Sequence, residues 1–168
     1  MRKRPRDLPH VPGRQRGIAL VMALTFLTIL ILTGTSAALN TSLQEHMAGN
    51  TRNRNLAFQA AEAALKDAEI TLTTWRTSAF DGSVPGLRTY VATQANDSVY
   101  WGTTYDWTAA ANYRTPTQTV AGVAEQPKYV VEKMPNNGAT EYYRVTARGV
   151  GGEINAVVVL QALYTYTP

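Results

Sequence analysis

Few side chains in this sequence have the types and spacing that catalysis or metal binding requires. The absence of cysteine removes thiolate ligands and thiol nucleophiles. His46 is the only histidine outside the first 17 residues, and Asp97 and Asp106 lack the D-x-D-x-D spacing of a calcium loop. The sequence has no Ser-His-Asp spacing, no G-x-S-x-G motif and no P-loop. We therefore expect no enzymatic activity, no bound metal and no cofactor.

The feature of the sequence that does point to chemistry is a junction between a basic and an apolar segment. Residues 15–21 read QRGIALV, so a basic segment ends in Arg-Gly and an apolar segment begins at Ile18. Such a junction is typical of a processing signal. An ordinary Arg-Gly pair at the edge of a signal anchor would look the same, so the junction alone leaves both interpretations open.

Positive charge is concentrated in a basic leader, residues 1–17. Six of the 16 Lys and Arg residues lie there beside a single acid, Asp7, whereas the remainder has 10 bases and 11 acids. The pI of about 9.5 is therefore a property of the leader, and we expect no nucleic-acid partner. Pro5, Pro9 and Pro12 prevent a persistent helix in this segment.

An uncharged stretch follows the leader and is long enough to cross a bilayer. Between Gly17 and Gln44 there is no charged residue. A hydrocarbon core of roughly 30 Å requires about 20 helical residues, so we expect a single transmembrane helix over residues 18–39. Because the bases precede this helix, the positive-inside rule predicts an inner-membrane protein with a cytoplasmic N-terminus and a periplasmic C-terminal domain.

The helix is expected to continue beyond the membrane, so that it covers residues 18–76. Residues 59–65, QAAEAAL, are strong helix formers. Apolar residues recur there at spacings of three and four, at positions Phe58, Ala61, Leu65, Ala68, Leu72 and Trp75. Such a helix would be roughly 90 Å long, which suits a fibre better than a globular domain.

The remaining sequence predicts a variable, loop-rich αβ region over residues 77–127 and an antiparallel sheet over residues 128–168. Three β-rich runs, 128–133, 141–148 and 153–164, are joined by short turns that contain glycine. The predicted fold class is α+β, with a long N-terminal helix packed on a C-terminal antiparallel β-meander.

Alternation in the middle run predicts one packed face and one wet face for this sheet. Tyr143, Val145 and Ala147 alternate with Arg144 and Thr146, so the apolar set is expected to pack on the helix.

Two tryptophans, Trp101 and Trp107, lie in the aromatic-rich stretch of residues 100–113. They could bind a sugar or a surface, but aromatic residues in a small cysteine-free domain more often belong to a core or a subunit interface.

Two blocks of the sequence resemble the type IV pilins, and among them the PilX-type minor pilins. The first is the QRGIALV junction, and the second is LQEHMAGN (residues 43–50) followed by RNRNLAFQAAEAAL (residues 52–65). The resemblance covers about residues 14–72, and the segment from YRVTARG (residues 143–149) through VLQ (residues 159–161) fits the same family more loosely.

The resemblance implies cleavage after Gly17 by the prepilin peptidase and N-methylation of the new N-terminus at Ile18. It also implies a pilin-like fold and a non-catalytic subunit whose N-terminal helix contacts other minor pilins and the major pilin. A large tip adhesin is a further candidate partner. The mature protein would pass from the inner membrane into a pilus fibre at the cell surface.

The sequence departs from most pilins at the fifth mature position, where Met22 replaces the usual glutamate. In the family this glutamate is thought to pair with the N-terminal amine of a neighbouring subunit. Because the first subunit of a fibre has no predecessor to pair with, Met22 favours a minor pilin that helps to initiate assembly at or near the tip.

Two alternatives to the pilin interpretation stay open. One is a secreted binding domain, released by signal peptidase I after Ser36-Ala37-Ala38, and the other is a permanently signal-anchored periplasmic domain. The mature N-terminus distinguishes the three cases, because it would be methylated Ile18 in a pilin, Leu39 in a secreted domain and Met1 in an anchored one.

Overall fold

The computed structural model describes residues 16–94 and 96–168, so most of the expected leader lies outside the described part. The chain divides into two units, Met1–His46 and Met47–Pro168. Each unit is described by itself.

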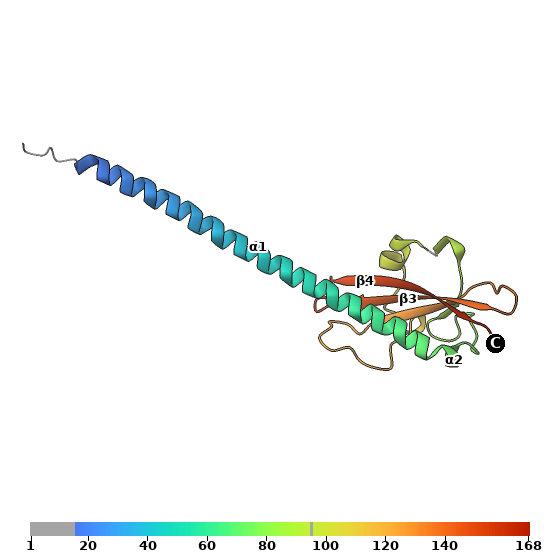
Figure 1. Ribbon diagram of the computed structural model, residues 1–168. Helices are drawn as coiled ribbons and strands as arrows, with labels where there is room; N and C mark the ends of the chain where they lie inside the picture. The colour runs from blue at the N-terminus through green and yellow to red at the C-terminus, as the bar shows by residue number, and fades with distance from the viewer. Residues whose placement is uncertain (1–15, 95) are drawn as a thin grey trace, which may run out of the picture. The chain divides into compact units, whose positions relative to one another are not determined.

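A long helix, α1 (Arg16–Ile70), begins in the first unit and ends in the second (Figure 1). In its last turn the backbone carbonyl of Asp67 accepts hydrogen bonds from the N–H and the hydroxyl of Thr71, at 2.9 and 2.7 Å. A one-turn helix, α2 (Leu72–Trp75), follows. The expected long N-terminal helix is therefore present.

The described part of the second unit contains a four-stranded mixed sheet with strand order β1-β2-β3-β4. Its strands are β1 (Leu87–Thr89), β2 (Lys128–Lys133), β3 (Glu141–Val150) and β4 (Val157–Tyr166). Strand β1 runs parallel to β2, and the other two pairs are antiparallel. The predicted α+β fold, with a long helix on an antiparallel meander, is confirmed, and the parallel strand β1 is an addition.

Short helical turns occupy part of the connection between β1 and β2. They span Ala92–Gln94, Tyr100–Thr104 and Ala110–Asn112. The middle turn carries Trp101, which packs on Val130 of β2.

Alanine lines the face of α1 that meets the sheet. Five alanines on this face are fully buried: Ala57, Ala60, Ala61, Ala64 and Ala68. Because alanine adds only a methyl group, the helix backbone lies very close to β3. At the point of closest approach β3 has Gly149, where a Cβ atom would overlap the carbonyl oxygen of Ala57.

Larger side chains fill the space between the sheet and the end of α1. Tyr143 and Trp75 are buried there in edge-to-face contact, with ring centroids 5.0 Å apart. The indole N–H of Trp75 donates to the carbonyl oxygen of Ala68 at 3.0 Å. The hydroxyl of Tyr164 donates to the carbonyl oxygen of Leu65, also at 3.0 Å. This core confirms that one face of the sheet packs on the helix.

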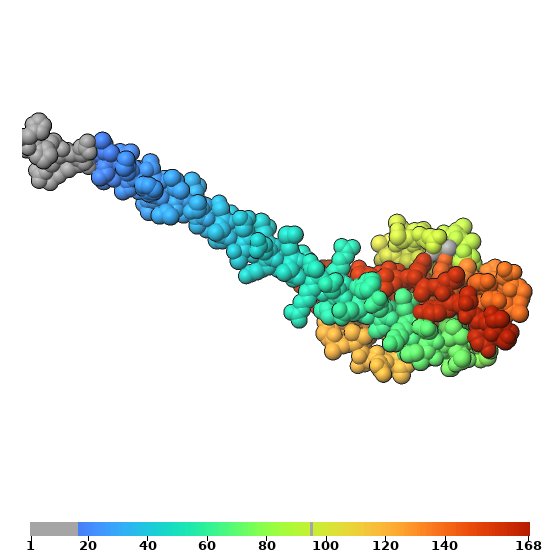
Figure 2. Space-filling view, viewed as in Figure 1, coloured from blue at the N-terminus to red at the C-terminus, as the bar shows by residue number. Residues whose placement is uncertain are grey.

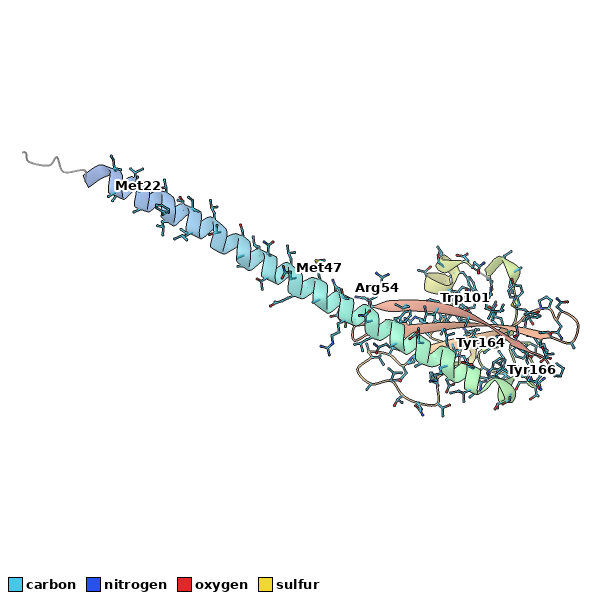
Figure 3. The ribbon with its side chains drawn as sticks, viewed as in Figure 1. Met22, Met47, Arg54, Trp101, Tyr164 and Tyr166 are labelled. Atoms are coloured by element: carbon cyan, nitrogen blue, oxygen red, sulfur yellow. The ribbon has the colours of Figure 1, made fainter. Side chains whose placement is uncertain are left out.

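The opposite face of the central strands, here called the outer face, is also covered, so the prediction of a wet face is wrong. Glu132 and Thr146 are fully buried, and Arg144 is 6% exposed. Trp101 and Trp107 pack on Val130 of β2, which lies on the same face, and the guanidinium carbon of Arg144 lies 5.8 Å from the ring centroid of Trp101. Trp101 and Tyr164 therefore belong to the cores on opposite faces of the sheet (Figure 3). Alternation of residue types could not show that a distant aromatic segment covers the polar positions.

We predict that Gly149→Ala lowers the free energy of unfolding by on the order of 2 kcal/mol, because the added methyl group must push α1 away from β3. Gly102→Ala is the matched control, since a Cβ atom at Gly102 has nothing within 4 Å. Urea unfolding followed by tryptophan fluorescence measures both variants. Equal stability of the two variants would contradict the close approach.

Candidate functional site

The first candidate site is the junction of Arg16, Gly17 and Ile18. Residues on both sides of the Gly17–Ile18 peptide bond belong to α1. Glycine weakens a helix because it adds backbone freedom. This bond is therefore easier to unwind into the extended form that a protease binds than a helical bond without glycine.

Packing within the described residues does not require glycine at position 17. A Cβ atom at Gly17 would have nothing within 4 Å, and Ile18 is 55% exposed. If glycine proves essential here, the requirement must come from a processing enzyme and not from folding.

The helix that follows this junction is suited to an apolar environment. Within the described residues, α1 is the one helix long and apolar enough to cross a membrane, with a mean hydropathy of 2.3 over 18 residues. The hydroxyls of Thr25, Thr28 and Thr33 donate to the carbonyl oxygens of Met22, Thr25 and Ile29 at 2.8 to 3.0 Å. These polar groups therefore have partners inside the helix, which lowers the cost of placing them in lipid.

Met22 lies on the surface of this apolar segment and is 57% exposed (Figure 3). Its side chain is flexible and apolar. The nearest acidic residue of α1 toward the C-terminus is Glu45. Residues 17–44 of α1 therefore offer no carboxylate to pair with an amine near position 22.

The second candidate site is an Arg–Glu–Arg cluster on the outer face, formed by Arg88, Glu132 and Arg144. Arg144 donates to Oε2 of Glu132 from Nε at 2.7 Å and also from Nη2. Nε of Arg88 lies 3.6 Å from Oε1 of Glu132. Burial raises the pKa of Glu132, although the two guanidinium groups oppose this shift. With all three groups ionised, the cluster has one excess positive charge.

Aromatic rings cover this cluster and use their own polar groups internally. The indole N–H of Trp101 donates to the carbonyl oxygen of Gln94 at 2.7 Å, and that of Trp107 donates to the carbonyl oxygen of Trp101 at 2.9 Å. The two indoles are 2% and 5% exposed. Trp101 and Trp107 are therefore core residues, and their rings are not open to a sugar.

Asp97 and Asp106 lie in turns and accept hydrogen bonds from neighbouring residues. Oδ1 of Asp97 accepts from the N–H groups of Val99 and Tyr100 at 2.9 and 3.0 Å. Oδ1 of Asp106 accepts from the hydroxyl and the N–H of Thr108 at 2.6 and 2.9 Å, and these bonds lower the pKa of Asp106. Residues 16–94 and 96–168 contain no group of three or more His, Cys, Asp or Glu side chains that could hold a metal ion.

Sequence reasoning missed the Arg–Glu–Arg cluster. A signal was available, because Glu132 and Arg144 are opposite charges in the middle of two β-rich runs. They prove to be directly paired in the register of β2 and β3. Arg88 carried no such signal, since it lies in the three-residue strand β1.

An ion pair at the other end of β2 holds the aromatic cover in place. Lys128 donates from Nζ to the carbonyl oxygen of Trp107 at 2.6 Å and also to Oε1 of Glu125. Arg148 donates to Oε2 of Glu125 at 2.7 Å. Partial burial raises the pKa of Glu125, but the hydrogen bonds from Lys128 and Arg148 outweigh it and the pKa lies below its ordinary value.

Comparison with known protein families gives two overlapping matches. A family model described as PilX N-terminal matches residues 16–66, and one described as type IV pilus assembly protein PilX C-term matches residues 55–166. The two matches together include both candidate sites. Comparisons with curated proteins and with solved structures found no match.

We predict that Glu125→Gln lowers the free energy of unfolding at neutral pH by on the order of 1 kcal/mol, because Lys128 and Arg148 lose a charged acceptor. The folded-state pKa of Glu125 is depressed, so its stabilisation is present above the unfolded pKa and is lost as the pH falls through the folded pKa. The difference from the natural protein should therefore close as the pH falls below about 4.

Urea titrations at a series of pH values measure this difference. Glu153→Gln is the control, because Glu153 is an exposed glutamate of the turn between β3 and β4. A destabilisation by Glu125→Gln that stays constant down to the lowest pH would show that the charge of Glu125 is not its cause.

Proposed function

Because the chain belongs to the PilX family and is a type IV pilus minor pilin, we propose that it is processed at Gly17 and helps to initiate pilus assembly. We place it at or near the pilus tip. The observation that carries this proposal is Met22, an apolar residue on the exposed surface of an apolar helix.

In the proposed processing step, the prepilin peptidase cleaves after Gly17 and the new amine of Ile18 is methylated. Glycine at this bond supports the choice of site, because it weakens the helix and lets the backbone extend. Cleavage removes residues 1–17 and with them six bases, which are the groups that hold the N-terminus on the cytoplasmic side. The mature helix then starts with an uncharged segment.

In the proposed topology, the mature N-terminus faces the cytoplasm and the second unit lies in the periplasm. The long apolar helix and the family membership fit a pilin anchored in the inner membrane. From there the subunit enters the fibre and exchanges lipid contacts for contacts with other helices. Its proposed partners are the other minor pilins and the major pilin through α1, the prepilin peptidase, and a large tip adhesin.

The role in initiation follows from the electrostatics of position 22. A charged side chain at the centre of a bilayer costs about 2.5 to 3.5 kcal/mol, so a glutamate there is useful only if it finds a partner. Each copy of a major subunit joins behind another copy and can pair with its amine. A first subunit has no predecessor, so Met22 avoids the cost of an unpaired carboxylate.

A secreted product that starts at Leu39 fits the structure less well. Helix α1 is continuous through Ala38, and Leu39, Leu43 and Met47 are 67%, 61% and 68% exposed. Release by signal peptidase I would leave these apolar side chains in water. Mass spectrometry of the mature N-terminus separates methylated Ile18 from Leu39 and from Met1.

We predict that Gly17→Val blocks processing and leaves a precursor about 17 residues longer than the mature chain, because the peptidase must fit the backbone at this point. No pili should form if the uncut chain is the only copy. Immunoblots of membrane fractions measure the size of the chain.

Gly34→Val is the control for this experiment, since Gly34 also lies in the apolar part of α1 and a Cβ atom there would have nothing within 4 Å. This variant should be cut normally. Normal cleavage of Gly17→Val would overturn the proposed site.

We predict that the protein is present in trace amounts relative to the major pilin, because an initiating subunit is needed once per fibre. Deletion should sharply reduce the number of pili and leave their diameter unchanged. Met22→Glu should be tolerated or only mildly harmful, because a lone carboxylate in the membrane can take up a proton. Quantitative mass spectrometry of sheared pili is the measurement, and amounts comparable to the major pilin would exclude the tip role.

A further inference from the structure

Strand β4 (Val157–Tyr166) ends the sheet and pairs with β3 alone among the described strands. Its register with β3 is continuous over all 10 residues, and it contains no charged residue, proline or glycine. Figure 2 shows this segment, in red, at the molecular surface. Natural proteins usually protect such an edge with a charge, a proline, a bulge or a cover, because an open edge pairs readily with another chain. Strand β4 has none of the first three.

Two hollows lie beside β4 on the outer face. One has a volume of about 220 Å³ and is lined in part by Trp101, Val159 and Gln161. The other, of about 320 Å³, is lined in part by Arg144, Gln161 and Leu163. An extended segment that added to β4 would direct every second side chain toward this face. The hollows are therefore placed to receive its side chains.

Charge indicates what the second hollow accepts. Arg144 lines it and is 6% exposed, and its Nη1 atom, which is itself buried, has no hydrogen-bond partner among the described residues. The other two donor nitrogens of this guanidinium are bound to Glu132. Since the Arg–Glu–Arg cluster has two bases for one acid, a carboxylate is the group that would complete it.

Neither a second copy of β4 nor the N-terminal residues of the chain are suited to supply this carboxylate. Neither β4 nor the two residues after it contain an acid, so pairing of β4 with the β4 of a second copy would leave Arg144 without a new partner. Residues 1–15 contain one acid, Asp7, among five bases and three prolines, which is a poor composition for a strand.

We propose that β4 is a docking edge for an extended, acidic segment of a different protein. The segment adds to the sheet as a fifth strand, and one of its Asp or Glu side chains enters the hollow beside Leu163 and binds Arg144. This inference goes beyond the proposed role in initiation, because it concerns the second unit and does not depend on where the subunit lies in a fibre.

The test is cross-linking of the full-length protein in cells that assemble pili. The photoreactive residue p-benzoylphenylalanine replaces Thr165, an exposed residue of β4, or Gln118, an exposed residue of the loop before β2. We expect Thr165 to cross-link to another protein, and mass spectrometry of the cross-linked peptide should identify an extended segment that contains Asp or Glu. Gln118 should not yield this product.

A matched pair of substitutions at Leu163 tests the charge. Leu163 is 59% exposed, so the fold tolerates either change. Leu163→Glu places a carboxylate of the chain itself at Arg144 and repels that of the partner, so the cross-link from Thr165 should fall about tenfold or more. Leu163→Gln has nearly the same size without the charge, and its cross-link should stay within about twofold of the natural protein. Immunoblots confirm equal amounts of each variant.

Several results would overturn the proposal. They are a cross-link to a second copy of this chain, a cross-linked segment without an acid, equal yields from Thr165 and Gln118, and equal losses in Leu163→Glu and Leu163→Gln. Pilus number is counted separately in the same cells. Failure of the docking proposal is therefore distinguishable from failure of the initiation role.

Discussion

The fold of the second unit depends on the close approach of α1 to β3. The helix offers Asn53, Ala57 and Ala61, one turn apart, and β3 and the residue after it offer Gly149 and Gly151. A Cβ atom at Gly149 would overlap the backbone of Ala57, and one at Gly151 would overlap the backbone of Asn53. One helical turn rises about 5.4 Å and two strand residues span about 6.6 Å, so the two small-residue repeats stay in step over this short distance.

This approach fixes the position of the whole sheet. Strand β3 lies between β2 and β4, so placing it against α1 also places both neighbours. The aromatic residues Trp75 and Tyr143 then fill the wider space beyond the alanine face. Small residues set the distance between helix and sheet, and large ones supply most of the buried apolar surface.

The outer face meets a different requirement, because it buries ionised groups. Taking Glu132 and Arg144 out of water is unfavourable unless their geometry is good and their remaining polar atoms are satisfied. The double hydrogen bond between them and the ring of Trp101 beside Arg144 meet part of this requirement. Oε1 of Glu132 and Nη1 of Arg144 have no hydrogen-bond partner among the described residues. A sheet covered on both faces also explains how a domain without cysteine, and therefore without disulfides, keeps its structure.

The sequence was sufficient to predict the elements whose pattern is long and local. The uncharged stretch and the three-and-four spacing of Ala61, Leu65 and Ala68 predicted the helix. Alternation around Tyr143 predicted its contact with the sheet. Strand β1 was missed because three residues are too few to show alternation. The outer face was misjudged because Arg144 and Thr146 are polar in any local pattern, and only the path of the chain brings Trp101 over them.

The candidate sites divide in the same way. Gly17, Ile18 and Met22 could be proposed from the sequence because a processing junction is a linear signal, and their roles stay predictions. The Arg–Glu–Arg cluster was not, because its members come from three strands and become neighbours only when the sheet forms. Linear signals can be read before folding, whereas a buried charge cluster is a product of folding.

The N-terminal segment of α1 shows how a helix can be prepared for two environments. Thr25, Thr28 and Thr33 donate to carbonyl oxygens of their own helix, so their hydrogen bonds need not change when lipid is replaced by protein. In the proposed assembly step the apolar side chains exchange one apolar surrounding for another, which has little cost. In the same proposal, the amine created at Ile18 must find a new partner, which the glutamate of the next subunit can supply. Met22 offers no such partner to the amine of another subunit, so in this proposal a subunit adds only behind this one and the order of assembly acquires a direction.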